Sequence, residues 1–392
     1  MPHACYMEFI PHGRNCLSTT PLPSIPQALG MTPLECNVRL SKRVLTAAIA
    51  VSTVALAAPA AIAPATAAKT VKVGLAYDIG GRGDKSFNDA AAAGLDKAKK
   101  ELHVTAKEVS ATAGGAASER EDKLRLLAQA GYNPIIAVGF LYGDSVKKVA
   151  AEFPNTSFAI IDDSSVALPN VSSLVFAEEQ GSYLAGVAAA KASKSGKIGY
   201  IGGVRIPLLQ KFEAGFVAGV KATKKSATVD VKYVTEPPDF GGFNDPAKAK
   251  VIANGMMDAG VDVIYAAAGG SGKGLFEAAA ASSKKVWTIG VDSDQYLTAA
   301  AAEKKNMLTS MLKRVDVAVF DMVSASVKGK MVADNIGAGA GIQGRRYNLK
   351  NNGVGLAASG GFLKTLKIDA AVAAATAKIK AGSIKVPTVP AA

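Results

Sequence analysis

The sequence predicts an α/β fold built from two consecutive Rossmann-like lobes with a cleft between them. With 392 residues, 49% of them hydrophobic, the chain can build two domains with separate cores. From Val71 onward, short apolar runs alternate with amphipathic stretches of about 12 to 18 residues. This alternation is typical of βαβ units and of parallel sheets. It runs through one series up to residue 177 and then through a second, which predicts two doubly wound halves.

The predicted elements follow from this alternation, the short apolar runs being strands and the amphipathic stretches helices. In the first series we expect strands at 71–77, 104–110, 134–139, 157–161 and 171–176, and helices at 86–101, 119–130 and 143–152. In the second series we expect helices at 178–193, 208–225, 245–259, 272–282 and 294–304, and strands at 196–202, 229–235, 261–267, 285–291 and 307–312. The remaining chain predicts a helix at 313–328, a Gly-rich segment at 332–345, a strand at 347–356 and an Ala-rich helix at 368–381.

Residues 39–68 have the pattern of an export signal. A basic start is followed by an apolar run at 44–58 and by the small-residue cleavage site Ala65-Thr-Ala67, so the mature chain is expected to begin at Ala68 or Lys69. The apolar run is too short to span a membrane, and no second such run occurs, so we expect no transmembrane segment in the mature chain.

The first 38 residues are Pro-rich and without periodicity, and we expect them to be an upstream extension that is not native to the protein. A natural start at Val38 would need a GUG codon, and Met31 is the alternative. The chain's three cysteines all lie in this segment. The mature chain therefore has no residue for disulfides, thiol catalysis, cysteine metal sites or lipid attachment.

The mature chain is basic. Removal of residues 1–68 takes away four basic and two acidic residues, so the net charge falls from +13 to +11. Its lysines are scattered in pairs such as Lys147-Lys148 and are not clustered with aromatic residues on one element. This pattern favours a solvated basic surface, and we expect no nucleic-acid partner.

The loop from Tyr77 to Asp89 lies between a predicted strand and a predicted helix, and it carries the clearest functional signal. At the carboxyl end of a strand in an open α/β sheet, a loop faces the ligand crevice. Asp78, Phe87 and Asn88 would offer a carboxylate, a stacking ring and an amide there. This combination suits a nucleoside better than a phosphate.

Motifs for phosphate binding and for catalysis are absent from the sequence. Neither Gly80-Gly-Arg-Gly83 nor the glycine-rich stretch at 269–274 has the spacing of a dinucleotide or P-loop motif. The mature chain has a single histidine, His103, which argues against a Ser-His-Asp triad and a multi-histidine metal site. We expect no cofactor and no metal.

Aspartates at strand ends leave one enzymatic reading open, because paired acids can catalyse glycoside hydrolysis. They comprise Asp78, Asp162, Asp163, Asp292 and Asp294. Carboxylates of this kind also accept hydrogen bonds from ribose hydroxyls. Nothing in the sequence supplies a supporting base or metal, so binding is favoured over catalysis.

Two phenylalanines of the second half remain candidates. Phe243 follows the predicted strand 229–235, and Asn244 or Asp245 can cap a helix that opens at Pro246, so its ring is expected on a loop that faces the cleft. Phe212 is four residues from Phe216, a spacing that usually marks a core face.

Several segments together resemble the basic membrane protein family of ABC-transporter substrate-binding proteins, whose best-known members resemble a purine nucleoside receptor of spirochaetes. The resemblance runs in order from about Val71 to the C-terminus. It is carried by the segments 73–88, 158–162, 180–186, 199–203, 212–216, 243–246, 268–274 and 289–295. It implies a type I periplasmic-binding-protein fold whose two lobes, with parallel sheets, are joined by hinge crossovers. It also implies an extracytoplasmic, non-enzymatic receptor that delivers a nucleoside to ABC permease subunits, and we expect a monomer.

The resemblance also implies roles for single residues and boundaries for the lobes. Asp78 and Asn88 would contact the base or ribose, Phe87 and Phe243 would stack on its two faces, Asp162 would close the first lobe's site, Asp292 would accept ribose hydroxyls, and Lys313 would reach in at a hinge crossing. Phe212 would replace or join Phe243. The N-terminal lobe would comprise 69–177 plus 313–345, and the C-terminal lobe 178–312 plus 346–392. Many members are lipoproteins, and this chain departs from them by lacking the lipobox cysteine.

Three alternatives remain at this point. The same fold could bind a sugar or another small polar metabolite, or the paired aspartates could make an enzyme. The effector half of a transcription regulator is a third alternative, against which the export signal and the absence of a helix-turn-helix argue.

Overall fold

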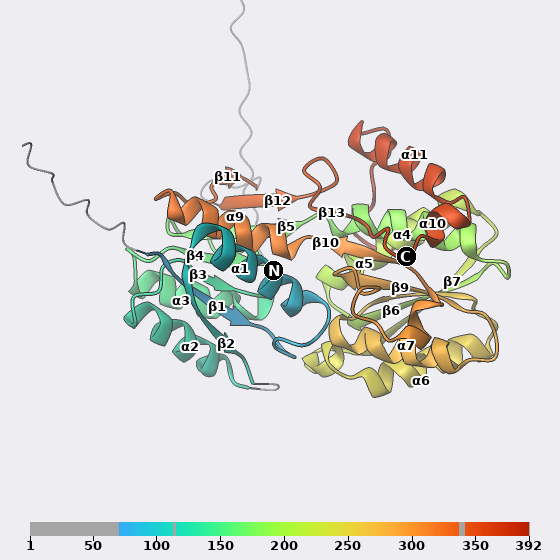
Figure 1. Ribbon diagram of the computed structural model, residues 1–392, viewed down its shortest axis with the longest axis horizontal. Coiled ribbons are helices and arrows are strands. Elements are labelled where there is room, and N and C mark those ends of the chain that lie inside the picture. The colour runs from blue at the N-terminus through green and yellow to red at the C-terminus, as the bar shows by residue number, and fades with distance from the viewer. Residues whose placement is uncertain (1–69, 113–114, 337–341, 392) are drawn as a thin grey trace, which may run out of the picture. The chain divides into compact units, whose positions relative to one another are not determined.

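The computed structural model describes residues 70–112, 115–336 and 342–391, and they form two separate β-sheets with helices packed on their faces (Figure 1). The first sheet has the strand order β11-β12-β5-β4-β3-β1-β2, and the second has β13-β10-β9-β8-β6-β7. Strand pairing is parallel except at β11–β12 and β10–β13. The predicted α/β class with two parallel-dominated sheets is confirmed.

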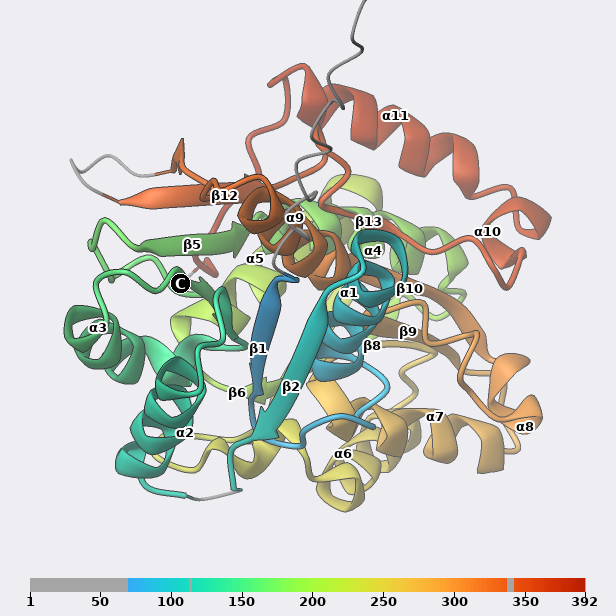
Figure 2. The same ribbon diagram turned by 60° about the vertical axis from the view of Figure 1, so that its left-hand side comes forward.

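The first sheet and the helices beside it are called the first lobe here. Its strands are β1 Lys72–Tyr77, β2 Thr105–Ser110, β3 Ile135–Ala137, β4 Phe158–Ile161, β5 Val171–Phe176, β11 Asp334–Asn335 and β12 Gln343–Tyr347. Its helices are α1 Phe87–Leu102, α2 Ala117–Gln129, α3 Gly143–Glu152 and α9 Val315–Val327, with the 3₁₀ turn η1 Phe140–Tyr142. Helices α1 and α9 lie side by side over the sheet, as Figure 2 shows.

The second sheet and its helices are called the second lobe. Its strands are β6 Lys197–Val204, β7 Thr228–Thr235, β8 Val263–Ala267, β9 Trp287–Asp292, β10 Met307–Lys313 and β13 Val354–Leu356. Its helices are α4 Glu178–Ala192, α5 Pro207–Thr223, α6 Pro246–Asp258, α7 Gly272–Ala281, α8 Ala301–Lys304, α10 Phe362–Thr365 and α11 Asp369–Lys380, with 3₁₀ turns η2 Phe240–Phe243 and η3 Gly269–Ser271.

The chain crosses between the lobes at three places: from β5 to α4, from β10 to α9, and from β12 to β13. Three crossovers close together are the arrangement in which two lobes can rotate as bodies about a common hinge.

Helices α4 and α5 pack with their backbones almost in contact, because glycines occupy the crossing points. A Cβ atom at Gly186 would lie 2.2 Å from the Phe216 carbonyl oxygen, and one at Gly219 would lie 2.1 Å from that of Tyr183. Helix α4 is otherwise rich in alanine and buried along most of its length. This close contact fixes α5, whose first turns carry the cavity-lining Leu208, Leu209 and Phe212.

The predicted start of α6 is confirmed in detail. Asp245 is its N-cap, since its side chain accepts a hydrogen bond from the Lys248 N–H at 2.9 Å, and Pro246 stands at the first helical position. This cap ends the loop that carries Phe243 and fixes where that loop leaves the second lobe.

Two predicted elements are wrong. The predicted helix at 294–304 is a turn followed only by the short α8, because Gln295 donates its backbone N–H to Ser310 Oγ and turns its side chain inward to Val291. The predicted strand 347–356 is broken by a turn at 349–352. Its two halves pair in different sheets, β12 with β5 and β13 with β10. Arg346 and Tyr347, assigned from sequence to the C-terminal lobe, therefore pair in the first sheet.

The predicted upstream extension, export signal and cleavage site lie outside the described residues. Within the described part of the chain, no helix combines the length and apolarity that crossing a bilayer requires.

Candidate functional site

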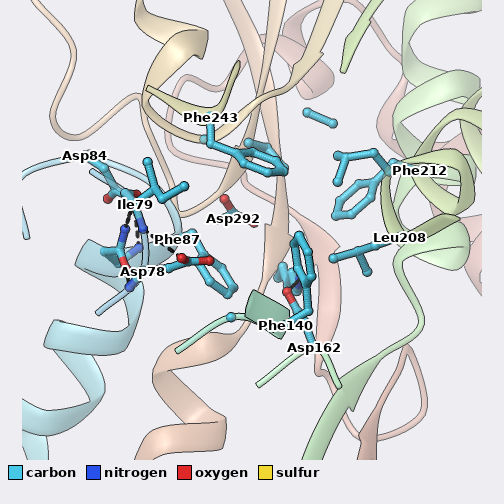
Figure 3. A pocket seen from close by; sticks show the side chains of 17 residues that line it. Asp78, Ile79, Asp84, Phe87, Phe140, Asp162, Leu208, Phe212, Phe243 and Asp292 are labelled. Atoms are coloured by element: carbon cyan, nitrogen blue, oxygen red, sulfur yellow. Dashed lines mark hydrogen bonds and ion pairs between the residues drawn. The ribbon is translucent and has the colours of Figure 1, made fainter. Parts of the chain in front are cut away.

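A cavity lies where the carboxyl ends of strands from the two sheets meet (Figure 3). It encloses about 590 Å³ free of protein atoms, part of it open to solvent. Its lining includes every residue for which the family resemblance implied a ligand contact, namely Asp78, Phe87, Asn88, Asp162, Phe212, Phe243, Asp292 and Lys313. Of the other strand-end aspartates, Asp163 and Asp294 do not line it. The structure thus brings together side chains that are as far as 235 positions apart, from 78 to 313.

The loop after β1 is organised by Asp84. One of its carboxylate oxygens accepts the N–H groups of Ser86 and Asp89, and the other accepts the N–H and the side-chain amide of Asn88. The Asn88 amide is further used within the loop, because its oxygen accepts from the Asp78 N–H at 3.0 Å and its nitrogen donates to the Ile79 carbonyl. Asn88 therefore lines the cavity with an amide that already has three protein partners.

Asp78 is held by this loop at the cavity wall. Its Oδ1 accepts the Ile79 N–H at 2.8 Å. Oδ2 packs against Gly139, whose backbone has a φ of 103° and where a Cβ atom would lie 2.2 Å from that oxygen. Burial raises the pKa of Asp78 to about 7.

Asp162 and Asp292 occupy matching positions in the two lobes. Asp162 follows β4 and Asp292 ends β9, and both have a left-handed backbone, with φ of 67° and 65°. A non-glycine residue in this region is uncommon, although Asp tolerates it better than most. Such local strain clusters at ligand sites.

One lysine joins the two lobes at this site. Lys313 at the end of β10 is 2% exposed, and its Nζ donates to Asp162 Oδ2 at 2.5 Å and lies 3.4 Å from Glu178. Burial lowers the pKa of Lys313, but Asp162, Glu178 and Asp292 reverse this and raise it. Burial also raises the pKa of Asp162 and of Asp292, the latter to about 7, while Lys313 opposes both shifts.

Aromatic rings surround the remaining space. The Lys313 ammonium lies 5.0 Å from the ring centre of Phe87 and 5.6 Å from that of Phe212. Phe212 is only 3% exposed, so it both packs in the core and lines the cavity. The Phe243 ring lies over Gly203, where a Cβ atom would come within 2.6 Å of it.

Sequence reasoning missed Phe140, which lines the cavity from η1 in the first lobe. Its ring centre lies 6.5 Å from that of Phe243, edge to face. Phe140 follows β3 closely, so the rule that loops after strands face the crevice could have found it. Leu208 and Leu209 at the start of α5 were also missed, and an apolar pair on a helix carries no signal that separates a cavity wall from a core.

The free polar atoms define what the cavity can bind. Asp162 Oδ1 is buried without a partner in the described structure, and Asp292 keeps one oxygen beyond its bond to Ser86. Such oxygens accept hydrogen bonds from hydroxyl or N–H groups, while the rings offer flat apolar faces. The described residues contain no cluster of three or more His, Cys, Asp or Glu side chains that could hold a metal ion.

Comparison with known proteins decides the family. The profile of a family described as "ABC transporter substrate-binding protein PnrA-like" matches residues 70–387. The chain belongs to this family. Members are substrate-binding proteins of ABC transporters and not enzymes, so the protein has a ligand and permease partners and works outside the cytoplasm.

Relatives in this family are similar over most of the chain. The "ABC transporter nucleoside-binding protein BmpA" of Lactococcus lactis is 37% identical over 87% of this chain and 98% of its own. "Basic membrane protein B" of Borreliella afzelii is 34% identical over 74% of this chain and 82% of its own.

Solved structures confirm the solute-binding fold. An ABC transporter solute-binding protein from Aeropyrum pernix superimposes with a TM-score of 0.67 at 29% identity, covering 81% of this chain and 93% of its own. A second, from Conexibacter woesei, has a TM-score of 0.63 at 24% identity, covering 81% and 99%. The two-lobed periplasmic-binding fold expected from sequence is therefore confirmed.

Proposed function

We propose that this substrate-binding protein captures a nucleoside, with a purine nucleoside as the leading candidate, in the cavity between its two lobes and delivers it to an ABC importer. The observation that carries the proposal is that aromatic rings and carboxylates from both lobes line the same cavity. A nucleoside base presents flat faces and its ribose presents hydroxyl donors, so both halves of the ligand find partners. The printed name of the Lactococcus lactis relative points to the same class of ligand.

In the proposed complex, Phe87 and Phe243 stack on the base from opposite lobes. The free oxygen of Asp292 accepts ribose hydroxyls, and Asp78 and Asp162 take hydrogen bonds from the base edge or the remaining hydroxyls. The protein's negative groups outnumber Lys313 around the cavity, which disfavours a phosphorylated ligand. Asn88 acts by fixing the loop, because its amide is already hydrogen-bonded.

We further propose that each lobe moves as a rigid body, that the two lobes close by rotating about the hinge formed by the three crossovers, and that the protein acts as a monomer. The lobes in this proposal are those expected from sequence, 69–177 plus 313–345 and 178–312 plus 346–392, with one change. The boundary at 345 moves to the end of β12, because the whole of β12 pairs with β5 in the first sheet. Export by the 39–68 segment would leave Ala68 or Lys69 at the N-terminus, and sequencing that terminus on exported protein tests it. A terminus upstream of Val38 would contradict it.

Native mass spectrometry of the protein purified from its own cells tests the ligand class, since tightly bound ligands often co-purify. The proposal expects an added mass that matches a nucleoside and disappears on denaturation. A co-purified sugar would instead support the alternative that the carboxylates bind sugar hydroxyls without a base.

A further inference from the structure

Beside the cavity, a second set of contacts joins the lobes through residues that do not line it. Ser86, just before α1, is fully buried, and Gln295, in the turn after β9, is 3% exposed. Neither belongs to the cavity lining, and both form hydrogen bonds from one lobe to the other. Their role is not explained by ligand contact.

Ser86 holds one oxygen of the Asp292 carboxylate. Its Oγ donates to Asp292 Oδ2 at 2.6 Å, and its backbone carbonyl accepts the Ser293 hydroxyl at 3.0 Å. Phe87, the next residue, faces the cavity. These contacts therefore fix the position of Phe87 in the first lobe relative to Asp292 in the second.

Gln295 makes the parallel connection. Its side-chain oxygen accepts the Val291 N–H at 2.9 Å, and its side-chain nitrogen donates to the Lys85 carbonyl at 3.0 Å. Gly290 leaves room for it, because a Cβ atom there would lie 2.3 Å from the Gln295 oxygen. The Lys85 backbone is left-handed, with a φ of 57°. This local strain is held only while the neighbouring structure maintains it.

We propose that Ser86 and Gln295 are positioning residues of a closure latch, which joins the lobes and orients Asp292 so that its second oxygen faces the ligand only in the closed form. The latch comprises Lys85, Ser86, Asp292, Ser293 and Gln295. When the lobes separate, the hydrogen bonds that cross between them break together. Asp292 then loses Ser86, the partner that sets its orientation. Lobe closure therefore also orients Asp292 to accept hydrogen bonds from ligand hydroxyls. This latch proposal rests on the proposed nucleoside function.

Two substitutions test the latch: Ser86→Ala and Gln295→Met, which removes the amide while keeping the length of the side chain. Ser173→Ala is the matched control, because Ser173 is fully buried in the first sheet and its hydroxyl has no partner in the described structure. A lost hydrogen bond to a charged group predicts adenosine binding about 10- to 100-fold weaker in Ser86→Ala, by calorimetric titration, and a smaller loss in Gln295→Met. The control should stay within about 2-fold.

A double-mutant cycle separates positioning from a merely structural role. Asp292→Gly removes the carboxylate and suits the left-handed backbone. If Ser86 acts through Asp292, adding Ser86→Ala to Asp292→Gly changes adenosine affinity by less than about 3-fold. A full additive loss in the double variant would overturn the positioning role.

Lobe closure is measured independently of any ligand. Spin labels at Leu126→Cys on α2 and Val251→Cys on α6 report the distance between lobes, since these side chains are 65% and 71% exposed and the chain from Lys69 has no other cysteine. Both latch variants should broaden the ligand-free distance distribution, and Ser173→Ala should not. If the latch variants change the distance between lobes but the unmodified protein binds no nucleoside, the proposed function is contradicted and the latch is supported. Affinities and distances that match the unmodified protein would overturn the latch.

Discussion

At the residue scale, the site depends on side chains placed where burial changes their chemistry. Phe87 and Phe243 are partly buried rings at the cavity, whereas Phe176 is a core ring with 1% exposure. Removal of a ring that stacks on a ligand should change the free energy of unfolding little. This difference separates binding residues from packing residues in an experiment.

Phe87→Ala and Phe243→Ala should each weaken nucleoside binding roughly 5- to 150-fold, since stacking on a base contributes about 1–3 kcal/mol. Their ligand-free melting temperatures should change little. Phe240→Ala is the matched control: its ring contacts Phe140 but does not line the cavity. Phe176→Ala should instead lower stability by about 3–5 kcal/mol. Calorimetric titration beside ligand-free melting curves checks all four variants, and unchanged affinity in both cavity variants would contradict the proposed sandwich.

Asp78 and Asp292 predict an unusual pH dependence. Their pKa values of about 7 lie above the unfolded value of about 4, so the folded protein binds protons that the unfolded chain does not between those limits. The ligand-free protein should become more stable as the pH falls from 8 to 5.5, by roughly 2 kcal/mol per group. Nucleoside affinity should change in the opposite direction, because a charged carboxylate is the better acceptor.

Melting curves and titrations across this pH range measure both effects. Asp78→Asn and Asp292→Asn should each flatten the stability profile. A ligand-free stability that rises with pH over this range, with the same slope in both variants, would show that these carboxyls do not titrate as described.

At the scale of the elements, glycines at strand ends make room for the functional side chains. Gly203 at the end of β6 leaves space for the Phe243 ring, and Gly139 after β3 leaves space for the Asp78 carboxylate. Both positions stand at the cavity edge of their sheets. The absence of a side chain at Gly203 and Gly139 is therefore what allows Phe243 and Asp78 to occupy their positions.

Gly203→Ala should push the Phe243 ring away and weaken nucleoside binding by roughly 5- to 100-fold, with the fold retained. Gly255→Ala in α6 is the matched control, since outside the adjoining backbone of its own helix no atom lies within 4 Å of an added Cβ. The control should bind normally and gain up to about 1 kcal/mol of stability from its higher helix propensity. Equal affinity in the two variants would mean that Phe243 is not held against β6 as described.

Sequence reasoning located the elements that depend on local pattern. Helix α3 and strand β5 agree with their predicted bounds, and Asp245 caps α6 as expected. It failed at 294–304 and at 347–356, where partners distant in sequence decide the conformation. Gln295 is turned inward by Val291 and Lys85, and the strand is divided between two sheets. Such tertiary contacts leave no periodic signal in the chain.

The same division holds for the site. Asp78, Phe87 and Asp292 could be predicted because loops after strands meet at one edge of a sheet. Phe140 obeys the same rule and was overlooked. The saturation of the Asn88 amide and the contact of Ser86 with Asp292 could not be inferred, because both need atomic positions across loops.

At the scale of the whole molecule, buried charges lie close to the crossovers between lobes. Lys313 ends β10 and pairs with Asp162 of the first lobe, while Arg346 of β12 pairs with Glu179 of α4 at 2.9 Å. Both partners of the Lys313–Asp162 pair are buried, so breaking that pair is costly. The Arg346 side chain is 48% exposed, so its pair with Glu179 contributes less.

Ligand binding should shift the protein toward the closed form. Small-angle scattering of the mature chain should give a smaller radius of gyration with saturating inosine or adenosine than without. Arabinose at the same concentration is the control and should leave the curve unchanged. An identical radius with and without bound nucleoside would argue for rigid lobes.

Calorimetric titration of ligand-free mature protein with inosine, adenosine and arabinose tests the central claim most directly. Protein is first unfolded and refolded to remove any co-purified ligand. The account predicts one nucleoside site per chain, with affinity lost when Phe87 and Phe243 are both changed to alanine, and no heat of binding from arabinose. Saturable binding of arabinose with no response to either nucleoside would contradict it.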